Sequence, residues 1–195
     1  MDTEQFKALL HQIKQVVALN QKLVGQGRKS LLDEEQVLSF NAFGEDIRLY
    51  LPNVASDAIQ GEIADEGAFF EANLLGKIYA RNLIPAGGTV LDIGCNIGNH
   101  TVFFSKVMKA GRVISFDLQP YCQRVFERNM QENKLEGVTF ERLGMGSEKH
   151  KARISRFLPN NIGATSFERS EDGEFQIDTL DSYCASKALN SIDFV

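Results

Sequence analysis

The chain has 195 residues with 43% hydrophobic and 24% charged side chains, a composition typical of a globular protein and not of a disordered or fibrous one. Its 26 acidic and 21 basic side chains give a formal charge of −5. This excess of acid argues against general binding to nucleic acid, because such binding depends on neutralising phosphates. No apolar run approaches the ~18 residues of a membrane span.

Residues 1–15 lack the continuous apolar core of a secretory signal. The three cysteines are odd in number and have no CxxC spacing, which predicts neither a disulfide framework nor a metal site. We therefore expect a reduced, cytoplasmic protein that contacts no membrane and no nucleic acid.

Residues 1–35 are predicted to form an N-terminal amphipathic helical segment, and residues 36–195 the main domain. One helix face collects apolar side chains at three- and four-residue steps and ends at Gly25 and Gly27: Phe6, Leu9, Leu10, Ile13, Val16, Val17, Leu23 and Val24. Asn20 falls at an a position of the heptad repeat, where asparagine can fix the register of a coiled coil. The apolar e positions widen the stripe, and this favours packing of the helix on the rest of the chain.

Residues 36–52 alternate apolar and polar side chains around Gly44, which predicts a hairpin. Apolar side chains at helical spacing then predict a helix from about Gly67 to Leu83. Pro85 and the two glycines after it end that helix.

From Thr89 onward, short apolar runs alternate with helical patterns. The predicted strands are Thr89–Ile93, Arg112–Phe116 and Val138–Leu143, and the helices between them are Asn99–Lys109 and Pro120–Lys134. This alternation predicts an α/β fold of the Rossmann-like type, with a doubly wound, mainly parallel sheet. Further strands are expected at Ala152–Phe157, Glu174–Ile177 and from Ser191.

The first of these strands runs into a glycine-rich turn, TVLDIGCNIGNHT over residues 89–101. Glycine lets the backbone approach a ligand closely, and the helix that follows offers unpaired N–H groups to an anion. The G-x-G-x-x-G spacing of dinucleotide-binding proteins is absent, and Asp92 would repel a pyrophosphate. Asp92 suits a ligand with an amine beside a carboxylate, as at the amino-acid end of S-adenosylmethionine.

The second strand ends at Asp117, about where a Rossmann-type unit places the carboxylate that accepts hydrogen bonds from ribose hydroxyls. Two carboxylates at the ends of neighbouring strands predict a ribose-containing cofactor at the carboxyl edge of the sheet.

Five ordered segments carry a resemblance to a known family: GAFFEA from Gly67, VLDIGCNIGNHT from Val90, ISFDLQPYCQRVFERNMQENKLEGVTFERLGMG from Ile114, LPNNIGATSFE from Leu158 and QIDTLDSY from Gln176. Through them residues 62–195 resemble the FkbM-type S-adenosylmethionine-dependent methyltransferases, which mostly methylate hydroxyl groups of sugars and natural products. The resemblance implies a class I methyltransferase fold, S-adenosylmethionine as cofactor, a small-molecule acceptor and no metal.

Together, the pattern of the residues and this resemblance give a set of candidate cofactor-binding residues: Glu71, Asp92, Gly94, Cys95, Asn96, Gly98, Asp117, Leu118, Gly144 and Met145. The family places Glu71 close to the cofactor and Gly144 and Met145 against the adenine. His100, beside the motif, is a candidate substrate residue, and the resemblance adds Asn161 and Ser166. No catalytic base is assigned.

The chain departs from the family at three places. Asp117 stands where glutamate is general, and Leu118 stands where proline is general. The family normally continues after a strand like SIDFV, whereas this chain stops at Val195. We therefore expect a sheet that is incomplete at the C-terminus, an exposed apolar edge and a missing part of the substrate site.

Other interpretations stay open. Asp92 could cap a turn, Cys95 could fill space, and His100 could pack or cap at the start of its helix. The chain could be catalytically incomplete and act only as a cofactor-binding or interaction module, with self-association through the N-terminal helix or the last strand. A nicotinamide-dependent oxidoreductase is a further alternative, disfavoured by the absent glycine triplet.

Overall fold

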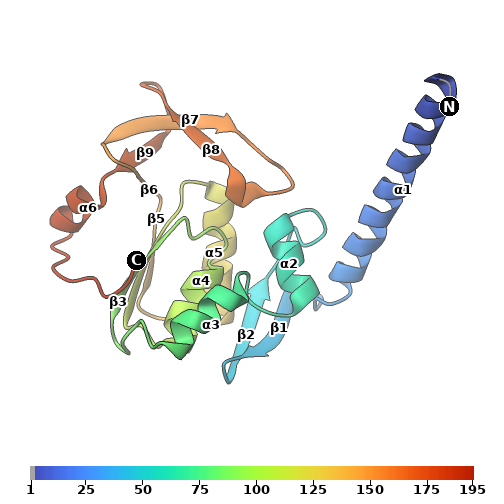
Figure 1. The fold of residues 1–195 in the computed structure, drawn as a ribbon. Coiled ribbons are helices and arrows are strands. Elements are labelled where there is room, and N and C mark those ends of the chain that lie inside the picture. Colours follow the sequence, from blue (N-terminus) through green and yellow to red (C-terminus); the bar gives the residue numbers. More distant parts are fainter. Residues whose placement is uncertain (1–2) are drawn as a thin grey trace.

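The computed structural model describes residues 3–195 and shows an α/β body with one long helix standing out from it (Figure 1). The N-terminal part consists of α1 Thr3–Lys29, the hairpin β1 Val37–Ala42 and β2 Glu45–Tyr50, and the helices α2 Ala58–Glu66 and α3 Ala72–Ala80. The hairpin confirms the strand pair predicted over residues 36–52.

The central sheet contains β3 Thr89–Ile93, β4 Arg112–Phe116 and β5 Val138–Glu141, all parallel, in the order β3-β4-β5. Between these strands lie α4 Asn99–Val102, which runs on into the π-helix η1 Phe103–Val107, and α5 Pro120–Glu132. Phe194 forms a parallel bridge to Val90 on the free edge of β3. The strand expected from Ser191 is reduced to this bridge.

The two faces of the sheet carry different helices, as the doubly wound prediction requires. Val90 and Val113 point into the core cluster that includes Val102 and Phe126 of the helices after β3 and β4. Leu91 and Ile114 point the other way and pack with Tyr183 of α6 Leu180–Ser186. Alternate residues of each strand are therefore buried on opposite faces, and the Rossmann-like α/β fold is confirmed.

A second, mixed sheet crosses the carboxyl edge of the first. Its order is β6-β9-β7-β8, built from β6 Gly144–Met145, β7 His150–Arg156, β8 Ser166–Arg169 and β9 Phe175–Asp178, with the short 3-10 helix η2 Ile162–Ala164 before β8. β6 follows β5 after a short link, so the third parallel strand of the core leads directly into this sheet. The predicted mainly parallel arrangement therefore holds for the central sheet β3-β4-β5, whereas β7 pairs antiparallel with β8 and β9.

The helix predicted from Gly67 to Leu83 is wrong at its start. Gly67 adopts the left-handed conformation and ends α2, a helix that the sequence pattern missed. Glu71 is also left-handed, with φ 58°, and stands at the N-cap of α3. The segment GAFFEA is therefore a connection between two helices, because two left-handed residues interrupt any helix through it.

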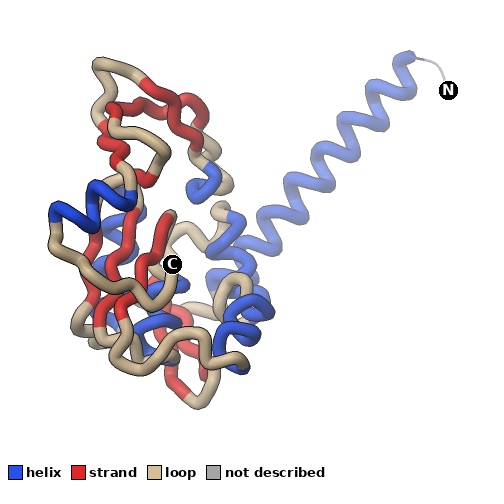
Figure 2. Tube along the Cα trace, turned by 60° about the vertical axis from the view of Figure 1, so that its left-hand side comes forward, coloured by secondary structure: helices blue, strands red, loops and turns tan. Residues whose placement is uncertain are grey.

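The prediction that the N-terminal helix packs on the body is also wrong. In both Figure 1 and Figure 2 α1 projects away from the sheets, and its apolar stripe is exposed, with Val16 63% accessible. Gly25 and Gly27 lie inside the helix and do not end it. Its last turns contact the body, where Gly25 meets Ala55 and Arg28 pairs with Asp65 at 2.6 Å.

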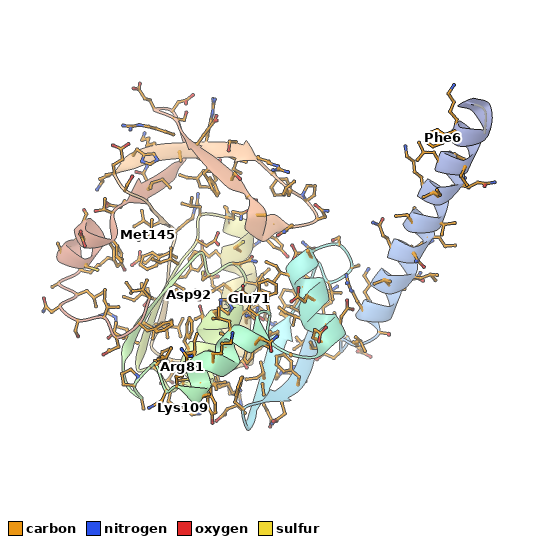
Figure 3. All side chains as sticks on the ribbon, in the orientation of Figure 1. Phe6, Glu71, Arg81, Asp92, Lys109 and Met145 are labelled. Carbon is orange, nitrogen blue, oxygen red and sulfur yellow. The ribbon has the colours of Figure 1, made fainter. Side chains whose placement is uncertain are left out.

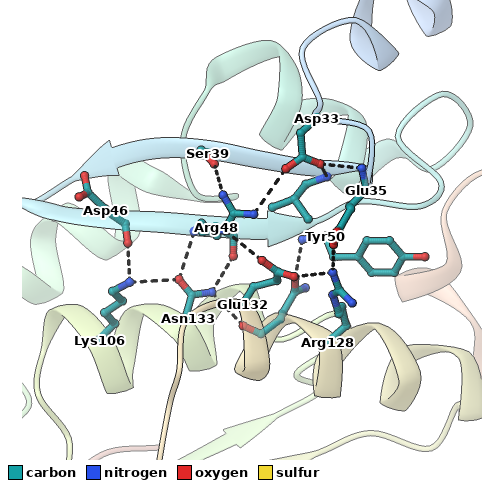
Figure 4. Close-up of polar contacts among 12 residues, drawn as sticks. Asp33, Glu35, Ser39, Asp46, Arg48, Tyr50, Lys106, Arg128, Glu132 and Asn133 are labelled. Atoms are coloured by element: carbon teal, nitrogen blue, oxygen red, sulfur yellow. Dashed lines mark hydrogen bonds and ion pairs between the residues drawn. The ribbon is translucent and has the colours of Figure 1, made fainter.

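Polar contacts fix the hairpin to α5 and so position the helix that follows β4 (Figure 4). The Arg48 guanidinium on β2 donates to the Glu132 carboxylate at 2.9 Å. The backbone N–H and carbonyl of Arg48 are both hydrogen-bonded to the side-chain amide of Asn133. The side-chain oxygen of Asn129 accepts a hydrogen bond from the backbone N–H of Tyr50 at 2.6 Å. These bonds are partly buried, which strengthens them.

Among the described residues, no helix combines the length and the apolar character that a membrane crossing requires. Within the same residues no group of three or more potential metal ligands comes together.

Candidate functional site

The glycine-rich turn joins β3 to α4 at the carboxyl edge of the sheet. Gly94 and Gly98 have φ of 81° and 84°, which side chains rarely adopt, and Asn96 between them is also left-handed. A Cβ on Gly98 would lie 2.7 Å from the ring of Phe126 and 2.8 Å from Met130. Gly98 therefore allows the turn to press directly against α5.

The backbone N–H groups of this turn have partners inside the protein. Those of Gly94 and Cys95 both donate to the carbonyl oxygen of Phe116, at 2.9 and 3.0 Å, and that of Gly98 donates to the Cys95 carbonyl. These three N–H groups are therefore taken up by the protein, whereas the anion site predicted from the sequence lies at the first N–H groups of the following helix α4. At Gly94 a ligand can approach the backbone closely, because the residue has no side chain and no other atom lies within 4 Å of where a Cβ would stand.

A cleft of about 190 Å³ opens between β3, β4 and the second sheet. Of the predicted cofactor residues it is lined by Gly94, Asp117, Leu118, Gly144 and Met145; the other lining residues are Ile93, Phe116, Gln119, Leu143, Gly163, Thr165 and Phe167. Figure 3 labels Met145, which lines the cleft, and Asp92 and Glu71, which do not line it. Half of the predicted cofactor set thus meets at one opening.

Asp117 is the acidic group of this cleft. Its two carboxylate oxygens accept from the backbone N–H groups of Asn96, at 3.1 Å, and Gln119, at 3.0 Å. Burial raises the pKa of Asp117, and the N–H donors oppose that shift. Hydrogen bonds from the Leu118 N–H and the Cys122 thiol lower the pKa in the same way, so the carboxylate is held by several donors of the protein.

Asp92 lies beneath the turn and does not line the cleft. It is 7% exposed, and it accepts a hydrogen bond of 2.5 Å from the hydroxyl of Thr101, which also contacts Ser115 at 2.8 Å. Burial raises the pKa of Asp92. The predicted direct contact between Asp92 and a ligand amine is therefore absent from this arrangement, since the side chain is turned toward α4.

We expect the free energy of unfolding of Asp92→Asn to increase, relative to that of the native chain, as the pH rises. The unfolded carboxyl ionises at its ordinary pKa, whereas the folded one keeps its proton to higher pH, so the native chain loses stability between those two values. Asparagine does not ionise and keeps an oxygen for Thr101. Urea unfolding of both proteins at pH 4 and pH 7.5 checks this, and a pH-independent difference would contradict it.

Cys95, Asn96 and Gly98 also lie off the cleft. Cys95 is buried, and its burial raises the pKa of the thiol well above the ordinary value, which supports the space-filling interpretation over a reactive one. The Asn96 side-chain oxygen accepts from the Cys122 thiol at 3.2 Å. These three residues shape the turn from inside.

Glu71 and His100 form a pair next to the turn. The Glu71 carboxylate lies 3.4 Å from Nε2 of His100 in the first turn of α4, without the geometry of a hydrogen bond. Beside them the Asn99 side chain exchanges two hydrogen bonds with the backbone of Phe70, at 3.0 and 3.2 Å. This clamp fixes the connection before α3 to the glycine turn, although neither Glu71 nor His100 lines the cleft.

The loop over residues 158–165 closes one side of the cleft. The Ile162 N–H donates to Asp57 at 3.1 Å, and the Ile162 carbonyl accepts from the Gln119 amide at 3.0 Å. Thr165 donates to the Gln119 oxygen at 3.2 Å. Of the two substrate residues predicted here, Ser166 is exposed at the start of β8, and Asn161 buries its side-chain oxygen without a hydrogen-bond partner among the described residues.

The loop residues that line the cleft are Gly163 and Thr165, which the sequence interpretation missed along with Gln119. The only available signal was their position: Gln119 follows Asp117 by two residues, and Thr165 lies next to Ser166. Nothing in the sequence pairs Gln119 with the loop, because more than forty residues separate them.

Comparison with known proteins gives a limited result. No protein-family model matches the chain. A curated protein, Methyltransferase 1 of Beauveria bassiana (strain ARSEF 2860), is 26% identical over 105 residues, which are 54% of this chain and 41% of that protein. The chain thus spans less than half the length of this relative.

Solved structures with local similarity include the putative transferase PH0793 of Pyrococcus horikoshii, at 21% identity over 57% of this chain and 37% of that one, with a TM-score of 0.38. TYW2 of M. jannaschii in complex with AdoMet is 17% identical over 56% of this chain and 44% of that one, with a TM-score of 0.36. Both scores are below 0.5, so the site rests on the residues of this chain.

Proposed function

We propose that this chain binds S-adenosylmethionine and is the cofactor-binding part of a methyltransferase. The observation that carries the proposal is that Asp117, Gly94 and Gly144–Met145 open on one cleft at the carboxyl edge of a doubly wound sheet. That edge is where open α/β sheets bind their ligands. The similarity to a protein named as a methyltransferase supports the same activity.

The residues of the cleft suit a nucleoside. The Asp117 carboxylate lines the cleft and is an acceptor suited to ribose hydroxyls, and Leu118, Met145 and Phe167 supply apolar walls for a purine. Gly144 lets β6 pack closely against the wall of the cleft, since a Cβ on it would lie 2.5 Å from Ile177 and 3.1 Å from Leu118. These features fit the proposed cofactor in chemistry.

When bound, S-adenosylmethionine supplies an electrophilic methyl group. The chain contributes chiefly by positioning. Asp117 would hold the ribose, and the turn at Gly94 would admit the methionine portion close to the backbone. Asp92, through its buried charge, would favour the cationic end of the ligand without touching it.

The finer proposal is methyl transfer to a hydroxyl oxygen of a sugar or natural-product-like small molecule. It is supported by the sequence resemblance of residues 62–195 and not by any contact in the cleft. Glu71 and His100 are the titratable pair next to the glycine turn, and we propose that the acceptor approaches from their side. A chain that binds the cofactor without turnover is the alternative.

Isothermal titration with S-adenosylhomocysteine tests the cofactor proposal directly. We expect saturable one-to-one binding and a rise in melting temperature at saturation, because a ligand that binds only the folded state stabilises it. NADH serves as the comparison ligand, and we expect no change in its fluorescence. Binding of NADH with no binding of S-adenosylhomocysteine would replace this proposal with the oxidoreductase alternative.

A further inference from the structure

A groove of about 940 Å³ lies between α1 and α2 and is bordered by Asn160 of the connection between β7 and β8. Its α1 wall contains two apolar side chains, Val17 and Val24, both about half exposed, beside the polar Asn20 and Gln21 and the charged Arg28. Its α2 wall is acidic, with Glu62, Asp65 and Glu66. An occupant of this groove must therefore present an apolar face together with positive charge.

α1 itself has both properties. Apart from Glu4 in its first turn, α1 contains no acidic residue, and Lys7, Lys14 and Lys22 are spaced along it away from the apolar stripe. In the heptad repeat Lys7 and Lys14 fall at b positions, beside the e positions of Val17 and Val24 that line the groove. The charge of α1 thus complements that of α2 on the flank where the groove lies.

At the C-terminal end of α1 the groove is closed by contacts with the body, where Gly25 lies against Ala55 and Arg28 pairs with Asp65. A second helix entering in parallel would bring its own body to that closed end. An antiparallel helix enters with the N-terminal half of α1, which projects away from the body in Figures 1 and 2, so that the two bodies lie at opposite ends of the helix pair.

We propose that the groove receives the N-terminal half of α1 from a second copy of this chain, so that the two α1 helices pair antiparallel and each fills the groove of the other. The apolar repeat provides a matching register, in which Phe6 faces Leu23, Leu9 faces Asn20 and Ile13 faces Val16 of the other copy. This pairing places Lys7 of each copy beside the acidic wall of the other. It is independent of the proposed cofactor function, because α1 does not line the cleft.

Sedimentation velocity of the full chain tests the proposal. We expect a dimer at micromolar concentration and a dissociation constant raised roughly 100-fold by Val16→Glu, which buries a charge at the centre of the pairing. The matched control is Ala18→Glu, which adds the same charge two residues away at an outer f position and leaves the dimer intact. Because both side chains are exposed in the single chain, the melting temperature of the body is expected to stay unchanged.

Two further measurements separate this proposal from other occupants. Spin labels on Lys7→Cys, in a chain carrying Cys184→Ser, are expected about 22 Å apart along the helix axis for the antiparallel pair, since fifteen residues separate positions 7 and 22. Labels in direct contact would indicate parallel pairing and overturn the proposal. A chain that stays monomeric at 100 µM also overturns it, as does a monomer that binds anionic lipid vesicles through α1.

Discussion

Asp117→Asn is expected to weaken binding of S-adenosylhomocysteine by roughly 10- to 150-fold. The change keeps one oxygen for the neighbouring backbone N–H groups but removes the charge that two ribose hydroxyls would share. A hydrogen bond to a charged group contributes about 1.5–3 kcal/mol, and tenfold in affinity corresponds to about 1.4 kcal/mol. Titration calorimetry of the two proteins at pH 7.5 measures the ratio of dissociation constants.

The matched control for this experiment is Asp181→Asn. It makes the same isosteric change at an exposed carboxylate in the first turn of α6, outside the cleft. Its affinity is expected to equal that of the native chain. If both variants bind as the native chain does, Asp117 does not hold the ribose, and the placement of the nucleoside in this cleft is wrong.

Gly98→Ala is expected to destabilise the chain by about 2–5 kcal/mol. A left-handed alanine costs about 1–2 kcal/mol, and forcing an extra methyl into a packed site costs about 1–3 kcal/mol more. Here the added Cβ meets Phe126 and Met130, which are buried in the core between α5 and the sheet. Urea unfolding of both proteins gives the difference in free energy.

Gly87→Ala separates the two costs. Gly87 has φ of 80°, close to that of Gly98, but its added Cβ would meet nothing within 4 Å. Gly87→Ala should therefore lose only the free energy that a left-handed alanine costs, and it should be less destabilised than Gly98→Ala. Equal losses for the two variants would mean that the turn does not press on α5 as described.

The central sheet could be predicted because its sequence signals are local. β3 and β4 occupy the predicted residues, and α5 ends two residues before its predicted end, since short apolar runs and amphipathic spacing report directly on burial. α2 was missed because its buried face includes Gln60 and Gly61, which carry no apolar signal. The polar stretch of β8 was missed for the same reason.

The candidate site could be predicted only in part. The positions of Gly94 and Asp117 follow from strand ends, which the sequence marks. The orientation of Asp92 does not, because it depends on Thr101 reaching back from the following helix. The exposure of α1 could not be predicted either, since the same amphipathic pattern occurs in helices that pack on their own chain and in helices that pack on another chain.

The loop over residues 158–165 is expected to limit the rate at which a ligand associates with the cleft. Ligand pockets usually measure about 300–1,000 Å³, whereas the opening beside this loop measures about 190 Å³. We expect a nucleoside to enter after the hydrogen bonds that Ile162 forms with Asp57 and Gln119 have opened. In stopped-flow mixing, the observed rate of association should therefore reach a plateau as ligand concentration rises, with the plateau set by the opening step.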